Sequence, residues 1–257
     1  MMSWLLETTF DNTSEHKTDG GEMKLRFAAT LLLTLCFVAL LAPKSTWAAE
    51  EGTFKIGALY DSELFRNSDS QRSYSGSYGG IVLGYEKQQD DFWWAVNGKY
   101  KYGRLKNESF RVDDAQIEGQ GVVGKIYDIN GFMLKPFIGL GINWEAQDEG
   151  GYDDYYVTEY VLPIGMRVER NTSVGLFGLD LQFGYLLGRE IYGTDGEPYW
   201  GRRFLDSSYN VEAGIYYESA DLPVGIRPYF KFEKWQTTKY WGRVERQHLG
   251  IETYVKF

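Results

Sequence analysis

The chain has 257 residues and a formal net charge of −9, with a calculated isoelectric point near 4.9. This acidic balance argues against a nucleic-acid partner, because nucleic-acid binding needs basic patches. Tyr, Phe and Trp make up 17% of the chain and there are 30 glycines, which is unusual for a helical membrane protein. The composition suits strands whose apolar and polar residues alternate and so never form a long apolar run.

The one long apolar run lies near the N-terminus. Residues 1–22 are polar and unpatterned, and Met23 opens a short basic segment before the apolar residues 28–42. Pro43 ends the run, and small residues follow it, as at a signal-peptidase site. The run has about 15 residues, fewer than the roughly 20 that a spanning helix needs. We interpret 23–48 as a cleaved signal peptide, with an uncleaved anchor as the alternative, and residues 1–22 as a misassigned start.

The mature part offers little for metal or cofactor chemistry. The only cysteine, Cys36, lies in the apolar run, so cleavage would leave no disulfide or cysteine metal site. The two histidines are His16, before the run, and His248. The acidic, glycine-rich stretch 148–154 lacks the spacing of a calcium loop, and a solvated loop explains it as well. We predict no metal site and no cofactor.

Residues 49–257 form one predicted domain with a repeated alternation of apolar and polar residues, typical of strands with one apolar face. Each stretch is close to the 9–11 residues that a tilted strand needs to cross a membrane. The ten predicted strands are 53–64, 75–87, 92–104, 114–127, 132–146, 156–170, 173–188, 207–219, 223–236 and 247–257.

The connections between these strands alternate between short and long. The short ones lie near 88–91, 129–131, 171–172 and 219–222. The long ones lie near 65–74, 105–113, 147–155, 189–206 and 237–246. Membrane barrels have short periplasmic turns, longer extracellular loops and an even strand number. The pattern predicts an all-β, transmembrane antiparallel up-and-down β-barrel of about ten strands, with eight or twelve as alternatives. A soluble β-sandwich would explain the alternation but not the loop order.

The last predicted strand, 247–257, alternates regularly and stops on Phe257. A soluble domain rarely ends an amphipathic strand this way, because nothing covers the edge. The segment resembles the terminal strand of the bacterial outer-membrane β-barrel proteins, a porin-like family, although Glu252 stands where a glycine is usual. The resemblance implies that Tyr254, Val255 and Phe257 are read by the barrel assembly machinery. It also implies export through the periplasm to the outer membrane.

The polar faces carry charges of both signs and would face the barrel lumen. Buried charge must be paired or solvated, and a small barrel leaves room for side chains or one small ligand. The faces predict either an ion-pair network that plugs the barrel or a narrow charged channel. The polar faces of the predicted strands also include Glu86 and Glu252. The predicted lumen network comprises Lys99, Lys101, Glu118, Glu145, Arg167, Glu169, Asp180, Glu212, Arg227, Lys231 and Glu233.

Trp and Tyr cluster near the ends of the predicted strands. We predict that they form two girdles at the membrane interfaces, where amphipathic rings lie among lipid headgroups. Carbohydrate-binding platforms are the alternative for residues in the loops. The predicted girdle residues are Trp93, Trp94, Tyr100, Tyr102, Trp144, Tyr155, Tyr156, Tyr216, Tyr217, Trp235 and Trp241.

The sequence leaves several functions open, because a fold does not define a function. The first hypothesis is a non-enzymatic structural barrel or narrow porin with long extracellular loops. A loop-mediated adhesin or ligand receptor is the second. A rim hydrolase is the third: Glu245 and His248 could activate water, but the motif of the omptin surface proteases is not recognisable, and we predict no catalytic residue. Expected partners are outer-membrane lipid, lipopolysaccharide, the assembly machinery, and small solutes or surface ligands.

Overall fold

The structure is a computed structural model, and it describes residues 52–67, 72–107, 111–148, 155–193, 198–204, 208–235 and 243–257. The predicted extension and signal peptide, 1–48, lie outside these residues. Among the described residues, no helix is long and apolar enough to cross a membrane. The strands are β1 Gly52–Asn67, β2 Arg72–Gln89, β3 Phe92–Lys106, β4 Arg111–Lys125, β5 Tyr127–Ile129, β6 Phe132–Asp148, β7 Tyr155–Thr172, β8 Gly175–Gly193, β9 Pro198–Phe204, β10 Tyr209–Ser219, β11 Val224–Trp235 and β12 Val244–Lys256.

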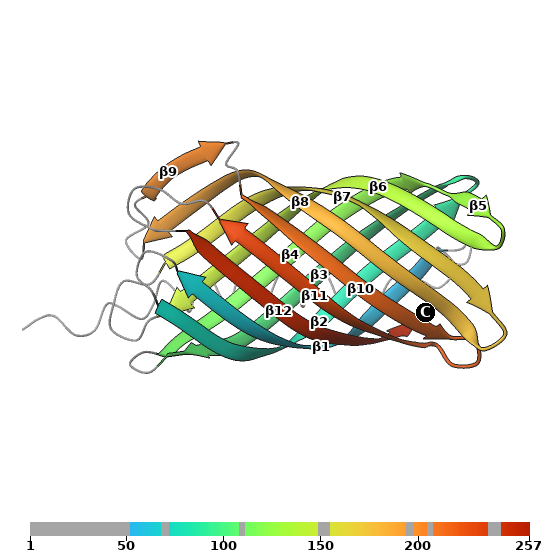
Figure 1. Ribbon diagram of the computed structural model, residues 1–257, viewed down its shortest axis with the longest axis horizontal. Helices are drawn as coiled ribbons and strands as arrows, with labels where there is room; N and C mark the ends of the chain where they lie inside the picture. The colour runs from blue at the N-terminus through green and yellow to red at the C-terminus, as the bar shows by residue number, and fades with distance from the viewer. Residues whose placement is uncertain are drawn as a thin grey trace, which may run out of the picture. The chain divides into compact units, whose positions relative to one another are not determined.

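The strands form one sheet that closes on itself (Figure 1). β1 pairs with β2 and β12, and β10 pairs with β8 and β11, all antiparallel. β5 extends the sheet beside β6, and β9 extends it beside β8. The other ten strands close a barrel in which neighbours in space are neighbours in sequence. This confirms the predicted antiparallel up-and-down barrel of ten strands.

The four short connections lie together at the end of the barrel that also holds the C-terminus (Figure 1). One of them shows why the chain turns there: Asn130 and Gly131 both have positive φ, of 54° and 79°. A two-residue hairpin turn of this type suits Asn-Gly, because both central residues must adopt φ > 0. Short turns mark the periplasmic end of outer-membrane barrels, so we name this end periplasmic and the opposite end extracellular.

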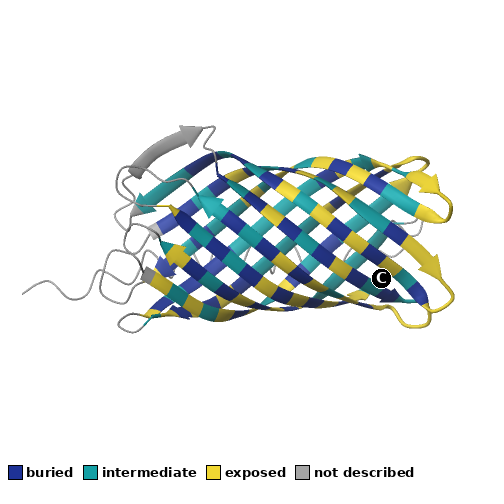
Figure 2. Cartoon of the chain, in the orientation of Figure 1, coloured by how far each residue is buried: buried dark blue, intermediate teal, exposed yellow. Residues whose placement is uncertain are grey.

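Residues alternate between the two faces of every strand, which gives the wall a chequered pattern of exposure (Figure 2). Many outward side chains are large and apolar: Leu140 is 66% exposed, Ile215 61% and Leu249 67%. Such an apolar outer surface is stable when it faces lipid. The inward side chains include most of the buried charges, so the barrel is apolar outside and polar inside.

Two lumen-facing glycines mark places where neighbouring strands come very close. A Cβ added at Gly57 would lie 2.0 Å from the carbonyl oxygen of Thr253, and one at Gly80 would lie 2.0 Å from that of Tyr100. By contrast, a Cβ added at Gly121 would have no heavy atom within 4 Å. The strong curvature of the wall therefore requires glycine at the first two positions.

The prediction of aromatic girdles is wrong for four residues, which point into the lumen. Trp93 is 0% exposed and packs edge-to-face on Phe137, with ring centroids 5.8 Å apart. Tyr156 and Tyr216 are also buried. The ring of Trp235 contacts the guanidinium groups of Arg189 and Arg246 inside the barrel. Consecutive strand residues face opposite sides, so Trp94 is outward and 40% exposed while Trp93 is inward.

The remaining predicted girdle residues fall into two groups. Tyr102 is outward and 47% exposed, and Tyr100, Trp144 and Tyr217 are half-buried. The side chain of Tyr155 and all of Trp241 lie outside the described part of the chain.

Candidate functional site in the barrel lumen

The extracellular half of the lumen is filled by a cluster that we call the plug: Asp61, Glu63, Lys101, Asp114, Glu145, Arg246 and His248. All seven are less than 9% exposed. They come from β1, β3, β4, β6 and β12, so the plug ties distant parts of the barrel wall together. Alternation places each of them on the inner face of its strand.

Arg246 is the centre of the upper plug. Its Nη1 and Nη2 donate to Oε2 and Oε1 of Glu145, each at 2.7 Å, and its Nε lies 3.6 Å from Oε1 of Glu63. Its guanidinium lies over the ring of Trp235, 4.2 Å from the centroid. Arg189 lies over the same ring, also at 4.2 Å, and donates twice to Oε1 of Glu159. Each guanidinium is therefore held by contact with the Trp235 ring and by two hydrogen bonds to one glutamate.

Asp114 occupies the neighbouring position in the plug. Its Oδ2 accepts from the Tyr78 hydroxyl at 2.7 Å and from Nε2 of Gln116 at 2.9 Å. Tyr78 packs in turn against Leu105 and Val112. The upper lumen therefore combines polar contacts with tight apolar packing.

His248 lies at the lower edge of the plug. Its Nδ1 is 3.1 Å from Oδ2 of Asp61, and the same oxygen accepts from Nζ of Lys101 at 2.9 Å. The ion pairs continue through Lys101 to Glu118 at 3.7 Å and then to Lys231, whose Nζ is 3.0 Å from Glu118. His248 is 1% exposed and Asp61 is 0% exposed. These side chains are enclosed.

The proposed Glu245–His248 pair of a rim hydrolase does not form. The two side chains are on opposite faces of β12, since three positions separate them. Glu245 accepts a hydrogen bond from Nη2 of Arg243 at 2.5 Å, while His248 lies inside the barrel. The sequence had suggested a rim location because His248 is the second residue of the predicted last strand, directly after the predicted loop 237–246.

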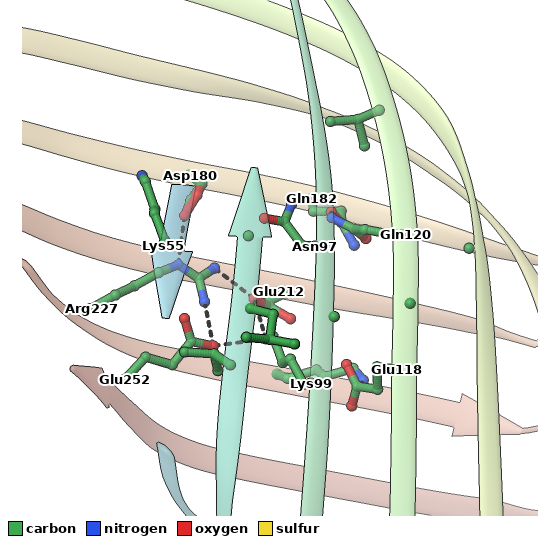
Figure 3. Close-up of a pocket in the computed structure, with 18 of the residues that line it drawn as sticks. Lys55, Asn97, Lys99, Glu118, Gln120, Asp180, Gln182, Glu212, Arg227 and Glu252 are labelled. Carbon is green, nitrogen blue, oxygen red and sulfur yellow. Dashed lines mark hydrogen bonds and ion pairs between the residues drawn. The ribbon is translucent and has the colours of Figure 1, made fainter. Parts of the chain in front are cut away.

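Arg227 organises the middle of the lumen (Figure 3). Its Nε donates to Asp180 at 2.7 Å, its Nη2 to Glu212 at 2.5 Å and its Nη1 to Glu252 at 3.3 Å. Nζ of Lys99 lies 2.8 Å from Glu252 and 3.7 Å from Glu212. Each cation at this level is therefore surrounded by carboxylates, which offset the cost of burying its charge.

A further group of ion pairs lies towards the periplasmic end. Arg167 donates to Glu86 at 2.7 Å, and Nζ of Lys135 is 2.8 Å from Glu169 and 3.3 Å from Glu86. The Tyr216 hydroxyl donates to Glu169 at 2.5 Å. The Arg167 guanidinium also lies over the Trp93 ring, 4.9 Å from its centroid.

Two cavities lie below the plug. The first, which we call the chamber, has a volume of about 140 Å³ and is lined by residues such as Asn97, Gln182 and Arg227. The second, the vestibule, has a volume of about 260 Å³ and lies by the periplasmic strand ends, with Gln88 and Asn171 in its wall. Among the described residues, no group of three or more His, Cys, Asp or Glu side chains could hold a metal ion.

The structure places all eleven predicted lumen residues on the inner face and in ion pairs or hydrogen bonds with one another or with other lumen residues. The prediction omitted partners that complete these contacts. These are Asp61, Glu63, Asp114, Lys135, Glu159, Arg189, Arg246 and His248. Asp61 and Glu63 share an alternating face with Lys55, and that signal could have identified them.

The three residues of the predicted assembly signal take different positions. Tyr254 points inward, and its hydroxyl donates to Glu218 at 2.9 Å. Val255 and Phe257 are exposed, by 38% and 70%. The backbone of Phe257 pairs with that of Phe54 through two hydrogen bonds, so the last residue belongs to the barrel wall.

No protein-family model matches the chain, and no curated protein matches it. Among solved structures, the chain is similar to the outer membrane protease OmpT from Escherichia coli, with a TM-score of 0.55, 8% identity, and coverage of 82% of this chain and 97% of that one. It is also similar to Neisserial surface protein A (TM-score 0.42, 15% identity, 80% and 100% covered). A third is the attachment invasion locus protein Ail of Yersinia pestis (TM-score 0.36, 12% identity, 80% and 99% covered).

At these identities, the likeness to OmpT concerns the fold alone. The chain has the fold of the bacterial outer-membrane β-barrels, and its apolar outer wall suits the hydrocarbon layer that such barrels span.

Proposed function

We propose that the protein is a non-conducting structural barrel, which anchors its extracellular connections in the outer membrane without passing solutes. The observation that supports this function is the difference in side-chain exposure between the chamber and the plug. Arg227 and Lys99 of the chamber are 15% and 18% exposed, whereas Lys101 is 3% and Arg246 2% exposed. The plug is therefore more tightly packed than the chamber.

A narrow porin needs a continuous water path from end to end, and the plug interrupts that path over several levels of side chains. The contacts at each level come from different strands, so opening the lumen would require several buried ion pairs to break together. Breaking one such pair by removing a partner costs about 3–5 kcal/mol, which makes spontaneous opening rare. A wide aqueous channel also needs about 16 strands or more.

The partners of such a barrel follow from its surfaces. Phospholipid and lipopolysaccharide acyl chains would cover the apolar wall, and the barrel assembly machinery would recognise Tyr254, Val255 and Phe257. We propose no catalytic residue, since His248 is enclosed by the plug.

Conductance across planar bilayers tests the proposal. Protein purified from the membrane, and shown to be folded by heat-modifiable gel migration, should give no discrete openings. Steady openings of the unmodified protein would contradict the proposal and identify a porin.

A matched pair of variants tests the role of the plug. Arg246→Ser combined with Glu145→Ser removes a buried pair and should produce small openings if the variant still folds. Arg104→Ser combined with Asp113→Ser removes a pair whose side chains are 50% and 35% exposed and should remain silent. Equal behaviour of the two variants would mean that the Arg246–Glu145 pair is not what closes the lumen.

A further inference from the structure

We propose that the chamber and the vestibule form a blind pocket that opens to the periplasm and binds a small uncharged polyol. This inference rests on the proposed closed barrel and adds a ligand and a direction of entry to it. Its basis is the combination of an accessible lower lumen, a closed upper lumen and a chamber wall rich in amides.

Entry is from the periplasmic side. The vestibule wall includes Gln88 and Asn171, both exposed residues near short periplasmic turns. The chamber and the vestibule share Lys55 and Tyr216 as wall residues, so they are adjacent. Arg167, paired with Glu86, lies close to this boundary. The side chains of this pair are 17% and 18% exposed, against 2% and 9% for the Arg246–Glu145 pair, so the boundary between the two cavities is more accessible than the plug.

The charges of the chamber favour an uncharged guest. Arg227 contacts three carboxylates, and Lys99 contacts two of the same three. A charged guest would have to replace one of these contacts and leave a buried charge without its partner, which is costly. An uncharged guest requires no such exchange.

The remaining walls suit hydroxyl groups and a carbon skeleton. Asn97, Gln120 and Gln182 lie on one side of the chamber, away from Arg227 (Figure 3). Nε2 of Gln120 donates to Oε1 of Gln182 at 3.2 Å, and the amides retain further donors and acceptors, which complement those of a hydroxyl group. Trp93 and Phe137 provide an apolar wall against which C–H groups can pack. This combination is what a short polyol requires.

The volume limits the size of the guest. A chamber of about 140 Å³ corresponds to about five water molecules, at about 30 Å³ each. Drug-sized ligands occupy pockets of about 300–1,000 Å³, so the chamber on its own is too small for them. A four-carbon polyol such as erythritol is of the right scale. A ligand this small is expected to bind with an affinity in the millimolar range.

Cysteine labelling tests both parts of the inference. The chain contains one cysteine, Cys36, so Cys36→Ser gives a thiol-free background for the full protein in lipid nanodiscs. Gln182→Cys in the chamber should react with a small methanethiosulfonate reagent, and Gln116→Cys beside the plug should react about tenfold more slowly, because thiol reactivity depends on access. Asn97→Cys provides a second chamber position if Gln182→Cys does not fold.

Two further measurements identify the entrance and the guest. Asn171→Trp, which covers the vestibule mouth, should slow labelling of Gln182→Cys, whereas Thr172→Trp on the outer face should not. Erythritol at millimolar concentration should slow labelling of both Gln182→Cys and Asn97→Cys by about half, since each variant keeps two of the three chamber amides, and a diol of the same carbon length should protect much less.

The possible outcomes separate the two proposals. Equally fast labelling at Gln116→Cys and Gln182→Cys would show an open lumen, and the closed-barrel function would fail. Chamber labelling that erythritol does not slow, or that the diol slows equally, would overturn the polyol site and leave the closed barrel standing. Unreactive thiols at both chamber positions would overturn the blind pocket itself.

Discussion

Replacing Arg246 by methionine should destabilise the barrel strongly. The change keeps a long apolar side chain but removes both hydrogen bonds to Glu145 and the ion pair with Glu63. Two carboxylates at the centre of the plug then lack their main cation. Removing one partner of a buried pair costs about 3–5 kcal/mol. The lost stacking on Trp235 adds about 1–2 kcal/mol.

The free energy of unfolding can be measured by urea titration of the protein in lipid vesicles, with tryptophan fluorescence as the signal and linear extrapolation to water. Arg104→Met is the matched control, because its pair with Asp113 is largely exposed and is expected to contribute about 0–1 kcal/mol. Adding Glu145→Gln to Arg246→Met should recover part of the loss, since it removes one uncompensated charge. A cost below about 1 kcal/mol for Arg246→Met would refute the reasoning that the plug depends on this cation.

Three other predictions follow from the wall of the barrel. Leu140→Lys places a charge near the middle of the lipid-facing wall and should cost about 2–4 kcal/mol in the same titration, whereas Leu222→Lys at a short turn should cost about 0–1 kcal/mol; equal costs would argue against the membrane position assigned here. Gly57→Ala should reduce the yield of heat-modifiable barrel, because its Cβ would meet a carbonyl oxygen, while Gly121→Ala should leave the yield unchanged; normal assembly of Gly57→Ala would show that the wall can relax. Deletion of Phe257 should slow assembly in cells more than it lowers the urea stability of the folded protein, and an equal effect on both would reduce the residue to a packing role.

The barrel itself could be predicted from the sequence, because its signals are local. Alternation fixes which residues share a face, and loop length fixes which strands are neighbours. The Asn130–Gly131 turn is also a local signal. Strand ends were less certain: β8 continues to Gly193, five residues beyond the predicted end, because strands of this barrel extend past the length that the membrane requires.

The contacts of the lumen could be predicted only in part. The alternation of residues along each strand placed Glu118 and Arg227 inside. It could not show that Arg227 contacts three carboxylates from three strands. Those contacts depend on the register of neighbouring strands, because Glu252 is the cross-strand partner of Arg227, Glu212 lies on the strand at its other side, and Asp180 lies one strand further. Trp93 was assigned to a girdle because aromatic residues near strand ends usually face lipid. Consecutive strand residues face opposite sides, so Trp93 and Trp94 could not both face lipid, and this rule would have been the better guide.

The pairing of the first strand with the last has a consequence for how the protein is made. β1 and β12 are joined along Lys55–Asn67 and Val244–Lys256, the two ends of the barrel sequence. Contacts between such distant residues form slowly, because the whole intervening chain must be ordered first. Until then both strands have unpaired edges that can join another chain.

The plug is subject to the same timing. His248 and Arg246 of β12 meet Asp61 and Glu63 of β1 only across this seam. Until β12 pairs with β1, Asp61 and Glu63 lack these two partners, so the plug is completed only when the barrel closes.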